Sequence, residues 1–103
     1  MTGIYKITNI LNHQIYIGLS VDIDRRWAKH RSNYTDINNK EYEKTLYRAF
    51  RKYGIENFVF EVIEECSKEE LSNREIYWIA YYDSFSNGYN ETPGGEIICS
   101  GGE

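Results

Sequence analysis

A carboxylate lies within an otherwise apolar helical face, where it must be paired, protonated or bound to a metal because an isolated buried charge is very costly. The face has the 4-3-4 spacing of a buried helical stripe and consists of Leu71, Glu75, Trp78, Ile79 and Tyr82. Periodicity alone leaves the state of Glu75 open. A salt bridge to Arg26 or a hydrogen bond to a tyrosine hydroxyl would satisfy it as well as a metal ion would.

Two phenol groups are expected to rise from one face of an N-terminal hairpin. Residues 3–8 and 14–19 alternate with period two and are rich in β-branched and aromatic side chains, which is typical of strands. With the turn centred after Ile10, Tyr5 lies opposite Tyr16. The chain holds ten tyrosines, and packing on a half-buried sheet is the alternative role for any of them.

An arginine and a histidine share the face of the next element. The sequence predicts a helix over residues 22–32, with Ser20 or Asp22 as its N-cap. Arg26 and His30 are one turn apart on that helix and therefore lie side by side.

The remaining patterns complete one small domain over residues 1–95. A second helix is expected over residues 41–53, a third strand over 58–63, and a third helix from the capping box at Ser67 and Glu70 to about Tyr82. The order ββααβα predicts the α+β class, as a small sandwich in which three helices flank a three-stranded antiparallel or mixed sheet. The glycine-rich tail, residues 96–103, is interpreted as a linker or the scar of a truncation.

Charge separates along the chain although the net charge is only −4. Residues 1–24 carry a net charge of −1, residues 25–52 carry +6 and the remainder carries −9. Such a distribution allows one basic face to meet a polyanion while the whole chain stays acidic. Two solvated surfaces without a partner are the alternative interpretation.

Composition excludes several classes of protein. Cys66 and Cys99 are too few for a disulfide scaffold and lack the spacing of a zinc site. No apolar run approaches the roughly 18 residues of a membrane helix, and no secretory leader follows Met1. The expected compartment is a reducing cytoplasm.

The order of several motifs resembles the GIY-YIG nuclease family. Its two signature triplets have counterparts in Gly3-Ile4-Tyr5 and Tyr16-Ile17-Gly18. Five further features occur in the family's order: Arg26 in Asp24-Arg25-Arg26-Trp27, His30, Leu46-Tyr47-Arg48-Ala49-Phe50, Arg74-Glu75 before an aromatic stretch, and Gly88-Tyr89-Asn90. Within the family, the chain is most similar to the catalytic domain of phage intron-encoded homing endonucleases.

The resemblance implies cleavage of DNA phosphodiester bonds with a divalent metal, Mg²⁺ or Mn²⁺. The family's functional residues correspond to Tyr5, Tyr16, Arg26, His30, Glu75 and Asn90. Glu75 is implied as the metal ligand, and a single carboxylate with retained waters suits Mg²⁺. By the same analogy Tyr5 is the general base, Tyr16 positions the water or a phosphate oxygen, and Arg26 stabilises the phosphate. His30 orients Tyr5, relays a proton or contacts phosphate, and Asn90 braces the site.

Several points stay open at this stage. Several relatives carry another His or Lys near the start of the second helix, and Lys40 is the candidate substitute here. The alternatives to a homing-type nuclease are a module that binds DNA or protein without cutting and the incision domain of a repair or restriction enzyme. We expect DNA to bind the basic face of residues 25–52. No motif for recognising a DNA sequence is visible, so we expect a separate C-terminal module to supply specificity. The oligomeric state is unknown.

Overall fold

The centre of the fold is a three-stranded sheet. The computed structural model describes residues 1–94, so the predicted tail over residues 96–103 lies outside the described residues. Strand β1 (Gly3–Asn9) is central and pairs antiparallel with β2 (Ile15–Ser20) and with β3 (Phe58–Glu65). Both β2 and β3 are therefore edge strands, and the sheet is antiparallel throughout.

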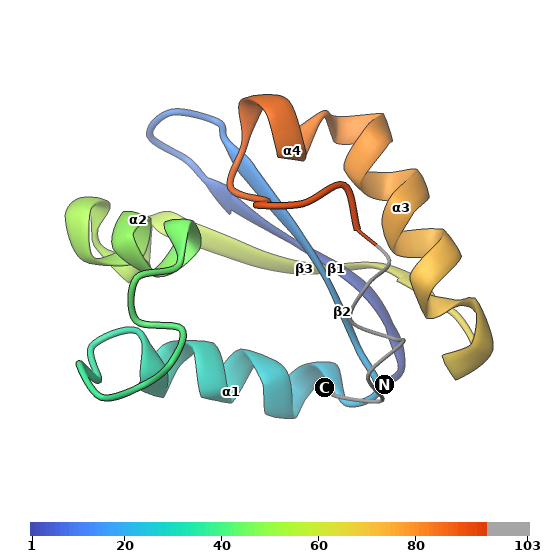
Figure 1. Ribbon diagram of the computed structural model, residues 1–103, viewed down its shortest axis with the longest axis horizontal. Helices are drawn as coiled ribbons and strands as arrows, with labels where there is room; N and C mark the ends of the chain where they lie inside the picture. Colours follow the sequence, from blue (N-terminus) through green and yellow to red (C-terminus); the bar gives the residue numbers. More distant parts are fainter. Residues whose placement is uncertain (95–103) are drawn as a thin grey trace.

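Helices cover both faces of this sheet (Figure 1). Alternation along the strands sends Ile4, Ile17 and Leu19 to one face, where they pack against Leu71 and Ile79 of α3 (Leu71–Tyr82). The other face presents a second buried cluster, to which α1 (Ile23–Asn33) and α2 (Thr45–Tyr53) contribute; it contains Tyr5, Ile7, Tyr16, Ile23, Leu46 and Phe50. The α+β sandwich and its element order are confirmed.

The hairpin register differs from the predicted one by two residues. Tyr5 lies opposite Gly18, and Tyr16 lies opposite Ile7. The turn is wider than expected because Asn9 closes it twice: its carbonyl accepts from the His13 amide at 2.7 Å, and its side chain accepts from Leu11. A slip of two residues preserves the face of every side chain, so both tyrosines still point to the same side of the sheet.

The second helix begins later than predicted, at Thr45 rather than residue 41. Residues 36–44 form successive turns, and the side chains of Asp36 and Asn39 accept backbone N–H groups within them. Such local hydrogen bonds compete with a helix. Lys44 is extended, and the carboxylate of Glu91 accepts from the Thr45 amide at 2.7 Å.

The first turn of the third helix is also different. It is the 3-10 turn η2 (Lys68–Glu70), which leads into α3, and Ser67 makes no side-chain bond to a backbone N–H there. The predicted capping box is therefore not formed. Another 3-10 turn, η1 (Ile55–Asn57), precedes β3, and the single turn α4 (Ser84–Asn87) follows α3.

After α4 the chain passes across the sheet near β2 (Figure 1). Within residues 1–94 no helix has both the length and the apolar character needed to span a bilayer.

Candidate active site

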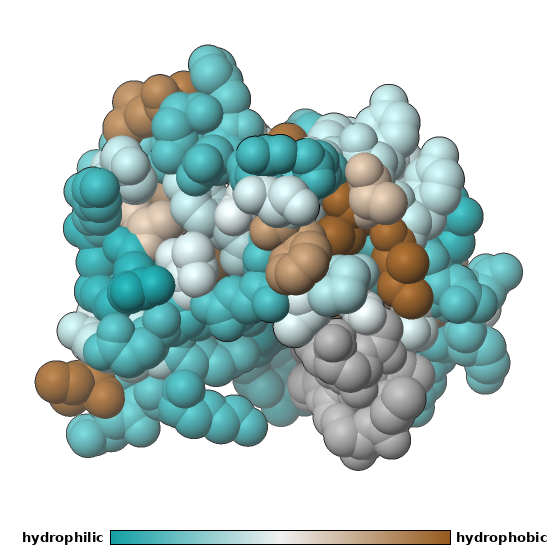
Figure 2. Space-filling model, turned by 45° about the horizontal axis from the view of Figure 1, so that its top comes forward, coloured by the Kyte–Doolittle hydropathy of each residue, from teal (hydrophilic) through white to brown (hydrophobic). Residues whose placement is uncertain are grey.

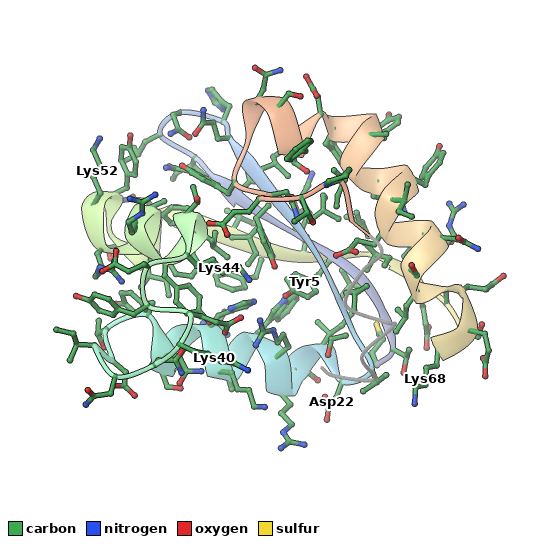
Figure 3. The ribbon with its side chains drawn as sticks, viewed as in Figure 1. Tyr5, Asp22, Lys40, Lys44, Lys52 and Lys68 are labelled. Carbon is green, nitrogen blue, oxygen red and sulfur yellow. The ribbon has the colours of Figure 1, made fainter. Side chains whose placement is uncertain are left out.

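Tyr5 occupies the middle of the face that α1 and α2 cover. Its side chain is buried, and its ring packs against Tyr16, edge-on to Trp27 and beside His30. Across the hairpin, a Cβ at Gly18 would lie only 2.3 Å from Tyr5 Cζ, so the missing side chain of Gly18 makes the room that this ring fills. In Figure 3, Tyr5 lies centrally, whereas Lys52 and Lys68 lie at the periphery.

His30 reaches Tyr5 from α1 and links it to a residue that the sequence analysis left unassigned. Nε2 of His30 lies 2.8 Å from the Tyr5 hydroxyl, and Nδ1 lies 2.9 Å from the hydroxyl of Tyr47 on α2. Burial lowers the pKa of His30 to about 2, with further contributions from nearby Arg26 and Lys44. The imidazole is therefore neutral near pH ~7 and carries one N–H, which it donates to one of these two oxygens.

Glu41 gathers the charges of the site. Its carboxylate accepts from Arg26 Nη2 at 3.0 Å and from the Tyr47 hydroxyl at 3.4 Å, and it lies 3.6 Å from Lys44 Nζ. Burial alone would raise the pKa of Glu41, but the two cations outweigh burial and hold that pKa below its ordinary value. Burial and the neighbouring carboxylate both raise the pKa of Tyr47, which keeps its proton. Glu41 is thus an anion that contacts two cations and a phenol.

Lys44, and not Lys40, is the lysine that reaches the tyrosine pair. Its Nζ donates to the Tyr16 hydroxyl at 3.0 Å and also lies 4.9 Å from the centre of the Tyr16 ring. Burial would lower the pKa of Lys44, but Tyr16 and Glu41 raise it above its ordinary value, so Lys44 stays an ammonium. The side chain of Lys40 is exposed.

Sequence reasoning missed three members of this cluster, namely Glu41, Lys44 and Tyr47. Only Tyr47 left a signal in the sequence: it lies three residues before Phe50 and so falls on the buried face of its helix. Nothing local marks Glu41 or Lys44, because the turns of residues 36–44 bring them to the site. The structure brings Tyr5, Tyr16, Arg26 and His30 into one cluster. Tyr5 contacts His30 directly, whereas Tyr16 and Arg26 join the cluster through the three missed residues.

Asn90 braces the free edge of β2. Its side-chain amide accepts from the Ile17 N–H and donates to the Ile17 carbonyl, both at 2.8 Å. Ser84 Oγ donates to the same Asn90 oxygen at 2.7 Å. One side chain thus takes the place of a neighbouring strand beside Tyr16.

Glu75 approaches the same edge from the other face of the sheet. It belongs to α3 and is 4% exposed. A Cβ at Gly94 would lie 3.2 Å from Glu75 Oε1, so the chain that Asn90 anchors to β2 continues to the Glu75 carboxylate. Arg26, one partner considered for Glu75, donates to Glu41.

A metal ion at Glu75 would take most of its ligands from water or substrate. Within residues 1–94 there is no group of three or more His, Cys, Asp or Glu side chains that could hold a metal. Mg²⁺ retains several waters and commonly binds one or two carboxylates together with substrate phosphate. Glu75 supplies one hard oxygen donor group, and the absent side chain of Gly94 leaves the space beside it narrow but unblocked by a Cβ.

The basic segment folds into α1, α2 and the turns between them, but several of its cations are engaged internally. Arg51 donates to the Tyr34 carbonyl at 2.7 Å, and Arg31 lies over the ring of Phe60. The exposed cations of the segment include Arg25, Arg31, Lys40, Arg48 and Lys52. The face drawn in Figure 2 is largely hydrophilic where it is coloured, and its hydrophobic residues form separate spots.

Comparison with known proteins places these features in a family. The family described as "GIY-YIG catalytic domain" matches residues 1–90. The chain is 35% identical over 92 residues to Intron-associated endonuclease 1 of Enterobacteria phage T4, covering 86% of this chain and 36% of that protein. It is 32% identical over 95 residues to Probable intron-encoded endonuclease 1 of Neurospora crassa, covering 85% and 29%. The chain therefore spans about a third of the length of these relatives.

A solved structure supports the same assignment. The catalytic domain of homing endonuclease I-TevI superposes with a TM-score of 0.77 and 32% sequence identity, covering 89% of this chain and 99% of that domain.

Proposed function

This chain belongs to the GIY-YIG catalytic domain family, and from that premise we propose that it is the catalytic domain of a metal-dependent DNA endonuclease that hydrolyses phosphodiester bonds. The observation that carries the proposal is that Tyr5, Arg26 and His30, which come from a strand and a helix, meet in one hydrogen-bonded cluster. Phosphodiester hydrolysis needs a proton acceptor for the attacking water and cations that offset charge on the phosphate. The cluster supplies both.

Tyr5 is proposed as the general base. Its oxygen takes the proton of the attacking water, while His30 fixes the direction of the hydroxyl through the 2.8 Å contact. Tyr16, held by Lys44, positions the water or a phosphate oxygen. Arg26 presents its guanidinium to the phosphate, a planar fork that matches two phosphate oxygens.

Glu75 is proposed to hold Mg²⁺, or Mn²⁺, at the edge of β2. When bound, the ion polarises the phosphate and stabilises the leaving oxygen. The chain's own contribution is to keep a carboxylate at a buried position that apolar neighbours of α3 define, beside the small residue Gly94.

DNA is proposed to bind across α1, α2 and the turns between them. Because the relatives are about three times as long as this chain, we expect sequence recognition to reside outside the matched domain. Alone, the domain should bind DNA weakly, and log affinity should fall steeply with log salt because phosphate contacts release counterions. Affinity that is insensitive to salt would oppose DNA binding by this face.

The test is cleavage of supercoiled plasmid with Mg²⁺ or with EDTA, for the wild type, Glu75→Ala and Glu69→Ala. Glu69 is an exposed glutamate of η2 and serves as the matched control. We expect nicking by the wild type and Glu69→Ala only with metal, and a loss of at least ~100-fold for Glu75→Ala with an unchanged circular-dichroism spectrum. Equal activity of Glu75→Ala and the wild type would refute the assignment of Glu75. Salt-dependent DNA binding without nicking by the wild type would favour the non-cleaving module instead.

A further inference from the structure

Three contacts join Tyr5 to the edge of the molecule through His30 and then through Tyr47 and Glu41, two residues that the family resemblance does not assign. The hydrogen-bond path runs from the Tyr5 hydroxyl to His30 Nε2 at 2.8 Å, from His30 Nδ1 to the Tyr47 hydroxyl at 2.9 Å, and from that hydroxyl to Glu41 Oε1 at 3.4 Å. The far end, Glu41, is a quarter exposed, whereas Tyr5, His30 and Tyr47 are almost fully buried.

The number of available protons determines which group donates in each hydrogen bond of this path. Each tyrosine hydroxyl has one proton, the neutral imidazole has one, and the Glu41 carboxylate can only accept. If Tyr5 donates to Nε2, Nδ1–H donates to Tyr47 and Tyr47 donates to Glu41, then all three contacts contain a hydrogen. In the opposite tautomer Tyr47 would donate to Nδ1, and its oxygen would face the Glu41 carboxylate with no proton between them. Glu41 is negatively charged, so the first arrangement is favoured.

We propose that Tyr5, His30, Tyr47 and Glu41 form a one-way proton relay, in which Tyr47 is the positioning residue that selects the tautomer of His30 and Glu41 is the final acceptor. This inference rests on the proposed function. As the water oxygen bonds to phosphorus and the bond to the leaving oxygen breaks, the water proton moves to Tyr5. The original Tyr5 proton moves to Nε2, the Nδ1 proton moves to Tyr47, and the Tyr47 proton moves to Glu41. Glu41 then releases its proton to solvent, and the leaving oxygen takes one from solvent water.

The relay explains how a histidine with so low a pKa takes part in proton transfer. Burial and the cations Arg26, Lys44 and Arg31 oppose an imidazolium, but in the relay His30 loses a proton at one nitrogen as it gains one at the other. Arg26, Lys44 and Tyr47 face Glu41 and keep its pKa low, so the proton passes through Glu41 rather than staying there. While Glu41 is protonated, its attraction for Arg26 and Lys44 is weakened, and both cations can turn toward the phosphate.

The tautomer of His30 is testable without substrate. In protein labelled with ¹⁵N at histidine, long-range proton–nitrogen correlation distinguishes a protonated Nδ1 from a protonated Nε2. We expect the Nδ1–H form in the wild type at neutral pH, and a shift toward the Nε2–H form in Tyr47→Phe. An Nε2–H or imidazolium form in the wild type would overturn the relay whether or not the chain cleaves DNA.

Cleavage kinetics test the transfer itself. Tyr47→Phe keeps the ring that stacks on Phe50 and should lower kcat by roughly 100-fold with KM changed less than about twofold, the low end of what positioned proton transfer contributes. Tyr81→Phe makes the same change at an exposed position of α3, outside both the cluster and the proposed DNA-binding face, and should leave kcat unchanged. Glu41→Gln still accepts from Tyr47 but cannot bind its proton, so it should also lower kcat. The double variant Tyr47→Phe/Glu41→Gln should then be no slower than the slower of the two single variants.

The outcomes separate the two proposals. If the wild type and Tyr81→Phe are both inactive, the proposed function fails and the relay fails with it as a catalytic device. An active wild type with a fully active Tyr47→Phe, or losses that multiply in the double variant, overturns the relay alone.

Discussion

Gly18→Ala should destabilise the protein severely although it adds a single methyl group. The new Cβ would lie 2.3 Å from Tyr5 Cζ, 2.4 Å from its hydroxyl oxygen and 2.7 Å from Cε1. A flexible side chain would swing away, but the Tyr5 ring is held between Tyr16, Trp27 and His30 at centroid distances of 6.3, 6.0 and 5.9 Å.

The loss of stability can be estimated from the displacement of the Tyr5 ring. Inserting a methyl group into a packed core destabilises by about 1–3 kcal/mol, and displacing Tyr5 also loses its hydrogen bond to His30, which contributes about 1 kcal/mol. We therefore expect the free energy of unfolding to fall by about 2–4 kcal/mol. Urea unfolding followed by tryptophan fluorescence measures the change, because Trp27 packs edge-on against Tyr5.

A double-mutant cycle isolates the cause. In a Tyr5→Ala background the ring is absent, so adding Gly18→Ala should have an effect of less than about 0.5 kcal/mol. A loss below about 0.5 kcal/mol for Gly18→Ala alone, in the wild-type background, would refute the reasoning. An equal loss in both backgrounds would instead trace the effect to the backbone of β2.

Two further predictions concern the groups around this ring. The pKa of His30 is lowered to about 2 from 6.5, so the imidazole is protonated in the unfolded chain but not in the folded one as pH falls below 6.5. The free energy of unfolding should therefore fall by about 2 kcal/mol between about pH 7 and pH 5. His30→Gln should remove most of that fall, and an unchanged pH dependence of this variant in urea titrations would contradict a neutral His30. Asn90→Ala leaves the N–H and carbonyl of Ile17 without their side-chain partner. The free energy of unfolding should therefore drop by about 2–3 kcal/mol, and the Ile17 amide should exchange with D₂O at least ~10-fold faster. Unchanged exchange would show that Asn90 does not protect the edge of β2.

The strands and helices were predictable where local pattern and tertiary structure agree. Period-two alternation over residues 3–8 and 14–19 assigned each side chain to the correct face, and Asp22 caps α1 as expected through the Arg25 amide. Glu75 was placed inside a buried stripe by spacing alone, and it is buried. These predictions needed only the periodicity of the elements and the chemistry of their ends.

The errors lie where the chain makes local bonds that periodicity does not encode. The hairpin register depended on the double closure by Asn9, and the start of α2 depended on the turns that Asp36 and Asn39 stabilise. The second error mattered for the site, because a helix over residues 41–44 would have placed Glu41 and Lys44 by helical spacing. The turns place them around Arg26 and Tyr16 instead.

The cluster that results has a charge suited to the proposed substrate. His30 is neutral, so the charged side chains are Arg26, Lys44 and Glu41, with a net charge of +1. A phosphodiester carries one negative charge, and binding it here would bring the cluster to neutrality. Without Glu41, two cations would face each other beside a buried phenol, and the repulsion would push them apart. Glu41 therefore holds both cations in position before a phosphate arrives, which is the electrostatic preorganisation that transition-state stabilisation requires.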